Sequence, residues 1–278
     1  MLQVNLLDLV INFIKLDFSR DIQSTVSNNR ANDAGSWLEG YIQDLILGDI
    51  PSTEENKNKV FSYLGSKNHP PDLILRDGPA IEIKKREGKS ALKSGLQLNS
   101  SHPRDKLFID DTKISSAVRE CEKGWDEKDL FYAIGHIDKK KLFSLFVVQG
   151  SCIAASRETY AGIESPIKKV LKELGTDDTN ELGKFNNVDL LGHTSLRVRG
   201  MWTLKNPFKI WEKSCVVGDE KKVGLNFLLE KSTFDLFQNT NKLCDIEGLH
   251  TEEIEVPSPN EPNKNINCIF LQYYKKEN

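Results

Sequence analysis

The sequence predicts an α/β protein in which a mixed central sheet is flanked by helices, and three features support this fold class. Apolar residues recur with helical spacing in residues 4–17 and 33–47. Residues 72–84 contain two short apolar strands joined by a turn. Residues 130–136 and 142–148 are near-continuous apolar runs, which are typical of strands buried on both faces of a sheet.

The predicted hairpin follows a short apolar strand at residues 60–64, so three consecutive strands are expected here. Its turn is Asp77-Gly78-Pro79, a sequence that strongly favours a tight reversal. If the turn takes these three residues, Arg76 pairs with Ala80.

That register brings two carboxylates and an ammonium group together. It sets Asp72 opposite Lys84, and because side chains alternate between the faces of a strand, Glu82 projects from the same side. The residues that project from the other side, towards a core, are Leu73, Leu75, Ile81 and Ile83. The hairpin is therefore expected to present Asp72, Glu82 and Lys84 as one cluster, anchored by its apolar reverse face.

The cluster has the composition of a site for phosphodiester hydrolysis. Asp72, Glu82 and the backbone carbonyl of Ile83 offer hard oxygen ligands, which Mg²⁺ accepts while it keeps several waters. Lys84 would stand beside such a water, where it could orient the water or lower its pKa. The alternative is an ordinary surface hairpin with a solvated charged face, and the motif alone does not decide between them.

Further elements follow the hairpin. Residues 112–121 are predicted to be a helix, a lysine-rich turn at 139–141 separates the two apolar strands, and residues 167–174 are predicted to be another helix. Near the end, a loop at residues 257–263 precedes a closing strand at 266–271. The order of helices and strands indicates a mixed α/β layer architecture.

The chain has 278 residues, of which 38% are hydrophobic and 28% charged, so it can bury a sizeable core. No change of composition marks a linker, and we expect a single domain over residues 1–278. The net charge of −3 argues against a protein that coats nucleic acid without specificity. A localised basic cleft remains compatible with this balance.

Two segments are locally basic. Residues 84–106 hold seven basic residues against two acidic ones, and residues 184–213 hold six against two. A phosphate backbone is expected to lie against such segments, although a mobile solvated loop would explain the first equally well. Its candidate DNA contacts are Lys85, Gln97, Asn99, Ser100, Ser101 and Arg104.

The second basic segment is centred on an apparent strand with two arginines. Arg197 and Arg199 are two positions apart, so both side chains face the same way. An arginine binds guanine best, through O6 and N7 in the major groove, and the pair therefore favours a GC-rich target. The alternative is a salt-bridged surface strand.

The five cysteines are scattered and include no Cys-x-x-Cys pair, which indicates reduced thiols, a cytoplasmic protein and no zinc site. The apolar N-terminal segment is interrupted by polar residues and does not have the pattern of a signal peptide. No apolar run approaches the length of a membrane span, and no phosphate-binding GxxxxGK[ST] loop is present.

The sequence Pro71-Asp72, followed after a spacer by Glu82-Ile83-Lys84, resembles the signature of the PD-(D/E)xK nuclease superfamily, and the predicted order of elements resembles the superfamily core. The resemblance implies that Asp72 and Glu82 bind the metal and that Lys84 orients the attacking water. It also suggests that Glu39, on the helix before the hairpin, supports the metal site. A solvated helix carboxylate is the alternative for Glu39.

Three further stretches resemble the NgoPII family of restriction endonucleases: residues 29–32 with Gly35 and Glu39, residues 96–101, and residues 196–202. The resemblance spans residues 29 to about 210 and adds Arg30 to the candidate DNA contacts.

This family resemblance implies a Mg²⁺-dependent type II restriction endonuclease of the bacterial cytoplasm that cuts double-stranded DNA at GGCC. It further implies a homodimer and a separately encoded DNA methyltransferase. On this basis residues 30–175 are expected to form the catalytic core, and residues 176–278 a recognition and dimerisation annex. Two other functions stay open: a structure-specific or repair nuclease of the same superfamily, and a catalytically dead, sequence-specific DNA-binding module.

Overall fold

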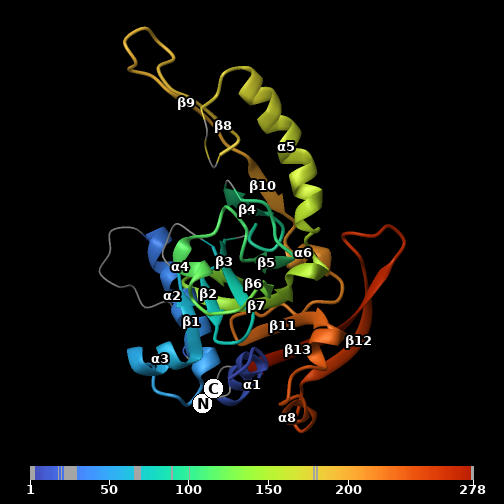
Figure 1. The fold of residues 1–278 in the computed structure, drawn as a ribbon. Coiled ribbons are helices and arrows are strands. Elements are labelled where there is room, and N and C mark those ends of the chain that lie inside the picture. Colours follow the sequence, from blue (N-terminus) through green and yellow to red (C-terminus); the bar gives the residue numbers. More distant parts are fainter. Residues whose placement is uncertain are drawn as a thin grey trace.

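A computed structural model of the chain describes residues 4–17, 19, 21, 30–65, 70–88, 90–99, 101–177, 179 and 181–276; the side chains of residues 30–34 and 99 are outside the description. In the described part of the chain, a nine-stranded mixed sheet forms the centre of the molecule, with helices against it (Figure 1). This confirms the predicted fold class. No described helix is both long enough and apolar enough to cross a membrane.

The sheet combines strands from both halves of the chain. In spatial order its strands are β1 (Phe61–Leu64), β2 (Leu73–Leu75), β3 (Ala80–Glu87), β6 (Glu127–Asp138), β7 (Lys141–Gln149), β11 (Lys222–Glu230), β13 (Asn265–Lys276) and β12 (His250–Pro257), while β5 (Lys106–Phe108) pairs with β6. The pairs β3–β6 and β7–β11 are parallel, and the others are antiparallel. Because β11 and β13 belong to this sheet, the boundary expected near residue 175 does not coincide with a sheet edge.

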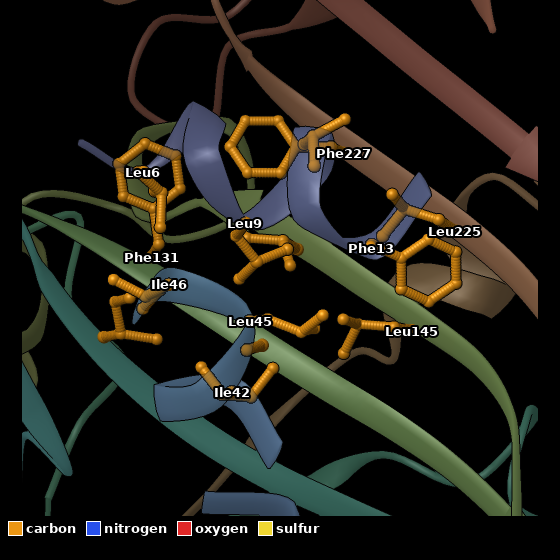
Figure 2. Close-up of a cluster of buried hydrophobic side chains, with 14 of the residues drawn as sticks. Leu6, Leu9, Phe13, Ile42, Leu45, Ile46, Phe131, Leu145, Leu225 and Phe227 are labelled. Carbon is orange, nitrogen blue, oxygen red and sulfur yellow. The ribbon is translucent and has the colours of Figure 1, made fainter. Parts of the chain in front are cut away.

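Two N-terminal helices cover one face of the sheet. They are α1 (Leu7–Lys15) and α2 (Arg30–Leu47), which confirm the predicted helices at 4–17 and 33–47. Figure 2 shows Leu9 of α1 and Leu45 of α2 packed towards Leu145 and Phe227 of the sheet. The buried face of each helix is therefore the apolar stripe seen in the sequence. A short helix, α3 (Glu54–Val60), leads into β1.

The other face of the sheet carries a second apolar cluster, which includes Tyr132, Phe146 and Phe270. Its cover is a two-stranded ribbon together with two short helices. These elements are β4 (Leu96–Asn99), β10 (Met201–Leu204), α4 (Ser116–Arg119) and α6 (Pro207–Ile210). Since successive strand residues point to opposite faces, the central strands are apolar on both sides, as their sequences predict.

One part of the chain extends away from the sheet. Helix α5 (Arg157–Glu173) and the ribbon of β8 (Gly183–Phe185) and β9 (Leu196–Val198) project together from the body (Figure 1). Three short helical segments complete the described elements: η1 (Gly150–Cys152), α7 (Lys231–Phe234) and α8 (Asn241–Cys244).

The predicted register of the β2–β3 hairpin is wrong by two residues. Leu73 pairs with Ile81 and Ile74 with Ala80, because the turn is centred on Asp77, one residue earlier than predicted. It is closed by the N–H of Leu75, which donates to the carbonyl of Pro79 at 3.0 Å. A shift of two leaves every side chain on its predicted face, so the apolar reverse side is buried as expected.

Two predicted helices have different bounds. The helix at 112–121 is reduced to α4, because the side chain of Asp111 accepts from the N–H of Lys113 and holds the preceding residues in a turn. The helix at 167–174 begins ten residues earlier, at Arg157, and contains Pro166 in its interior. The closing strand is also longer than predicted and runs from Asn265 to Lys276.

Candidate active site

The end of the β2–β3 hairpin brings the predicted catalytic side chains together. Asp72 immediately precedes β2, while Glu82 and Lys84 lie two apart on β3 and share a face. The N–H of Asp72 donates to the carbonyl of Ile81 at 3.1 Å. The carboxylate of Asp72 accepts from the N–H of Ile83, with 2.5 Å between Oδ2 and N. Backbone pairing therefore fixes Asp72 beside the centre of β3.

Glu82 and Lys84 form a partly buried ion pair. Their Oε1 and Nζ atoms are 2.5 Å apart, and their side chains are 11% and 29% exposed. The second carboxylate oxygen of Glu82, Oε2, is buried and has no hydrogen-bond partner among the described residues. A buried carboxylate oxygen is costly to leave without a partner, so this atom marks a place where a ligand would be stabilising.

The electrostatics of the cluster also favour a cation. Burial raises the pKa of Asp72 to about 7, and the nearby carboxylates of Glu82 and Glu39 add to the rise against the opposing effects of Lys84 and of the Ile83 N–H. Burial lowers the pKa of Lys84, but Glu82 and Asp72 outweigh it and the net shift is upward. The site thus holds more negative charge than Lys84 alone balances.

Glu39, on α2, belongs to the same electrostatic environment. Its carboxylate raises the pKa values of both Asp72 and Lys84. Glu39 is therefore close enough to the hairpin for its charge to act on both groups. Its role in supporting a metal remains a prediction.

The donor set fits one hard divalent cation that keeps several waters. The N–H and C=O of one strand residue point to the same side. Since the N–H of Ile83 points to Asp72, its carbonyl also points past the end of β2, towards that carboxylate. Among the described residues, no three Asp, Glu, His or Cys side chains are grouped as a complete metal site. The ligands of a bound cation would therefore be two carboxylates, one carbonyl and several waters. Mg²⁺ is commonly bound by such a set, because it keeps much of its water shell.

The candidate DNA contacts fall into different environments. Lys85 lies on the opposite face of β3 from Lys84, with its Nζ 3.4 Å from Oε1 of Glu87. Gln97 is exposed on β4. Arg30 lies at the start of α2 and Asn99 at the end of β4, but their side chains, like all of Ser100, are outside the described part of the structure.

Arg104 is placed in the interior. It is 6% exposed, and its guanidinium donates to Asp111 at 2.8 Å and to Ser101 at 2.6 Å. Its backbone N–H donates to the hydroxyl of Tyr132 at 2.8 Å. In this arrangement Arg104 and Ser101 organise the segment that follows β4, and the arginine side chain is not presented to solvent.

Arg197 and Arg199 face the same way, as predicted from their spacing, and both bind Glu181. The guanidinium of Arg197 lies 2.8 Å and that of Arg199 2.7 Å from Oε1 of this carboxylate. These contacts match the salt-bridged alternative. Both arginine side chains are nevertheless about half exposed, at 54% and 53%, so each guanidinium still has a solvent-facing edge.

The structure pairs two stretches that lie a hundred residues apart in the sequence. In the β4–β10 ribbon, Gln97 is opposite Thr203 and Asn99 is opposite Met201. The segments 96–101 and 196–202, noted separately in the sequence, thus meet at residues 96–99 and 201–202, while residues 196–198 belong to the separate β8–β9 ribbon.

Arg86 is a residue that the sequence analysis did not single out. It follows Lys84 by two positions on the same face of β3, and its guanidinium donates to the hydroxyl of Ser94. The buried amide of Asn206 holds the same loop, donating to the carbonyls of Ala91 at 2.8 Å and Ser94 at 3.3 Å. Arg86 therefore links β3, the strand of Glu82 and Lys84, to the loop that leads into β4. The sequence did contain a signal for Arg86: residues 82, 84 and 86 are each two apart, so their side chains project from the same face of the strand.

Comparison with known proteins identifies the family of this chain. Residues 4–258 match the profile of the NgoPII restriction endonuclease family. The type II restriction enzyme NgoPII of Neisseria gonorrhoeae is 38% identical over 281 residues, which cover 98% of this chain and 100% of that enzyme. No solved structure is significantly similar. With near-complete coverage and the hairpin cluster in place, the chain belongs to the NgoPII restriction endonuclease family.

Proposed function

We propose that this restriction endonuclease hydrolyses double-stranded DNA at GGCC with Mg²⁺ as its cofactor, in the cytoplasm of a bacterium. The observation that carries the proposal is the cluster of Asp72, Glu82 and Lys84 at the end of one hairpin, where a buried oxygen of Glu82 has no partner among the described residues. The membership of the family supports the same reaction.

Each residue of the cluster has a distinct task in this proposal. Asp72, Glu82 and the carbonyl of Ile83 would hold the cation, which when bound neutralises the charge that develops on the phosphate. Lys84 Nζ, fixed 2.5 Å from Glu82 Oε1, can donate a hydrogen bond to the attacking water and hold it in line with the scissile bond. The hydrogen bond from Ile83 to Asp72 keeps the carboxylate in position before DNA arrives.

Sequence selection is assigned to the projecting β8–β9 ribbon and to the β4–β10 ribbon that covers the sheet. Arg197 and Arg199 supply the hydrogen-bond donors that suit guanine best. Both guanidinium groups bind Glu181, and on DNA binding this carboxylate would either release the two side chains or hold them in alignment. The exposed face of the β4–β10 ribbon, which contains Gln97, adds neutral hydrogen-bonding groups. These contacts agree with a recognition site built only of G·C pairs.

A palindromic site implies a two-fold symmetric homodimer with one active site for each strand. It also implies a partner encoded elsewhere, a DNA methyltransferase that protects the same sequence in the host.

The proposal is tested by digestion of a plasmid of known sequence with the purified protein and Mg²⁺, with EDTA as the control. Mapped ends that all fall at GGCC would support it, and prior methylation of these sites should block cleavage. Ends at another palindrome would overturn the assigned site, while scattered ends or ends at branched structures would indicate a repair nuclease. Specific binding without cleavage in Mg²⁺ would indicate a dead DNA-binding module.

A further inference from the structure

Helix α5 is attached to the body along one face only. Its 17 residues include no buried side chain. The contacts include the ion pairs of Arg157 with Asp110, at 2.5 Å, and of Glu164 with Lys113, at 2.7 Å. Tyr160 lies between Arg157 and Glu164 on the same face, and its ring packs against the rings of His102 and Trp202. The attachment therefore combines ion pairs with aromatic contacts on one face, and it leaves the rest of the helix open (Figure 1).

A second face of α5 is apolar and exposed. Ile163, Ile167, Val170 and Leu174 are 49%, 41%, 56% and 67% exposed. Their spacing of four, three and four residues is that of a heptad seam, the pattern by which one helix packs against another. With about 3.6 residues per turn, this stripe lies roughly a quarter of a turn from the attached face. The body of the protein therefore does not cover it.

The helix is poorly suited to stand alone in water. It contains Gly162 and Pro166, both disfavoured in a helix interior. Helical stability in proteins comes mostly from packing of the apolar face, and here that face has no partner within the described chain. Contact with another surface would supply the missing packing.

The neighbouring arm adds more exposed apolar surface. Val188, Leu190 and Leu191 are 61%, 107% and 77% exposed in the loop between β8 and β9. The loop is well defined, because the carboxylate of Asp189 accepts from the N–H groups of Leu191, at 2.9 Å, and Thr194, at 2.7 Å. Together with the stripe, these side chains offer an area on the order of the roughly 800 Å² that one subunit contributes to a standard interface.

The composition of the stripe favours a second protein chain over nucleic acid as its partner. Nucleic acid is bound by positive charge, yet the four stripe residues are uncharged, and Lys169 lies on the other side of the helix. A heptad seam can instead pack against an identical seam, as a two-fold interface requires.

We propose that the α5 stripe, with the apolar tip of the adjoining arm, is the surface through which two copies of this chain associate. The inference deepens the proposed function, because a palindromic site needs two active sites. Its test requires neither DNA nor cleavage.

The experiment measures the mass of the full-length protein by analytical ultracentrifugation at micromolar concentration without DNA. The wild-type protein should sediment as a dimer of the 31.5 kDa chain. Ile167→Glu combined with Val170→Glu should shift it to a monomer, or weaken the dimer at least tenfold. Lys169→Glu on the same helix should leave the dimer intact, and Ile167→Leu should behave as wild type. Circular dichroism and the melting temperature monitor folding of every variant.

A monomeric wild-type protein would overturn the proposal, and so would a double variant that dimerises as tightly as wild type. An unchanged dimer with weakened DNA binding would make the stripe a DNA contact and also overturn it. The measured oligomeric state does not depend on whether the protein cleaves DNA. A stripe-dependent dimer that does not cut GGCC would refute the proposed function alone, whereas cleavage at GGCC by a stripe-independent dimer would refute this interface alone.

Discussion

The carboxylate of Asp72 accepts a hydrogen bond from the backbone N–H of Ile83, with 2.5 Å between Oδ2 and N. This contact joins the residue before β2 to the residue between Glu82 and Lys84 on β3. One oxygen of Asp72 is thereby fixed by the backbone, close to the carboxylate of Glu82, whose Oε2 has no hydrogen-bond partner in the part of the chain that the structure describes. The geometry of the site is therefore set by the hairpin itself, before any ligand is present.

Asp72→Asn should separate the structural role of this side chain from its charge. The amide oxygen can still accept from Ile83, but the cation loses a ligand, so cleavage should fall by at least about a hundredfold. At pH 8 the metal-free variant should be as stable as wild type or more so, because the raised pKa of Asp72 shows that its charge is unfavourable in the fold.

The measurement is the melting temperature with and without Ca²⁺. Ca²⁺ should raise it for the wild-type protein and have little effect on Asp72→Asn. An unchanged Ca²⁺ response in the variant would show that Asp72 is not a ligand.

Arg199→Ala should weaken discrimination at one base pair of the site, by about 1–3 kcal/mol for a lost bidentate contact. The check is competition binding in Ca²⁺ against duplexes that carry each single base-pair change. Glu181→Gln is the matched control, since it removes the negative charge that holds both arginines without removing either arginine. A loss that is uniform across all sequences would make Arg199 a phosphate contact.

Arg86 should couple the active-site strand to the loop before β4. Arg86→Met and Ser94→Ala each remove the same hydrogen bond, so each should reduce specific DNA binding, and the double variant should be little worse than either single one. A double-mutant cycle measures this coupling. Additive losses would show that the two residues act separately.

The buried pair of Arg104 and Asp111 should make stability depend on pH. Burial raises the pKa of Asp111, but Arg104 and the N–H of Lys113 outweigh it and hold the pKa below its usual range. The contribution is thus present above the ordinary pKa near 3.8 and is lost as the pH falls through the lowered value.

Asp111→Asn should cost about 3–5 kcal/mol near neutral pH, since it leaves a buried arginine without its counter-charge. Urea unfolding between pH 3 and 7 measures this difference. It should be constant above pH 5 and shrink in acid. A difference that does not change with pH would mean that the charge of Asp111 is unimportant.

The sequence was sufficient to gather Asp72, Glu82 and Lys84 because only the alternation of strand faces was needed. The register error of two residues in the hairpin did not change any face. The buried runs of β6 and β7 were equally clear, since their apolar character does not depend on pairing.

Other features depend on contacts that no local pattern shows. Arg104 looked like a DNA contact within a basic segment, but Tyr132 and Asp111 hold it inside the protein. Strand β11 contains Gly224 and Asn226, which are unfavourable in strands by propensity. Asn226 is buried because its side chain bonds both backbone groups of Val216. These partners are adjacent only after folding.

Single-turnover cleavage of a GGCC duplex by Lys84→Ala, at saturating enzyme and Mg²⁺, tests the active site most directly. Lys85→Ala is the matched control, because this neighbouring lysine projects from the other face of β3. The account predicts that Lys84→Ala binds the duplex in Ca²⁺ within a few-fold of wild type but does not cut it, while Lys85→Ala cuts at the wild-type rate once bound. Cleavage by Lys84→Ala at the wild-type rate would contradict the assignment of the hairpin as the catalytic centre.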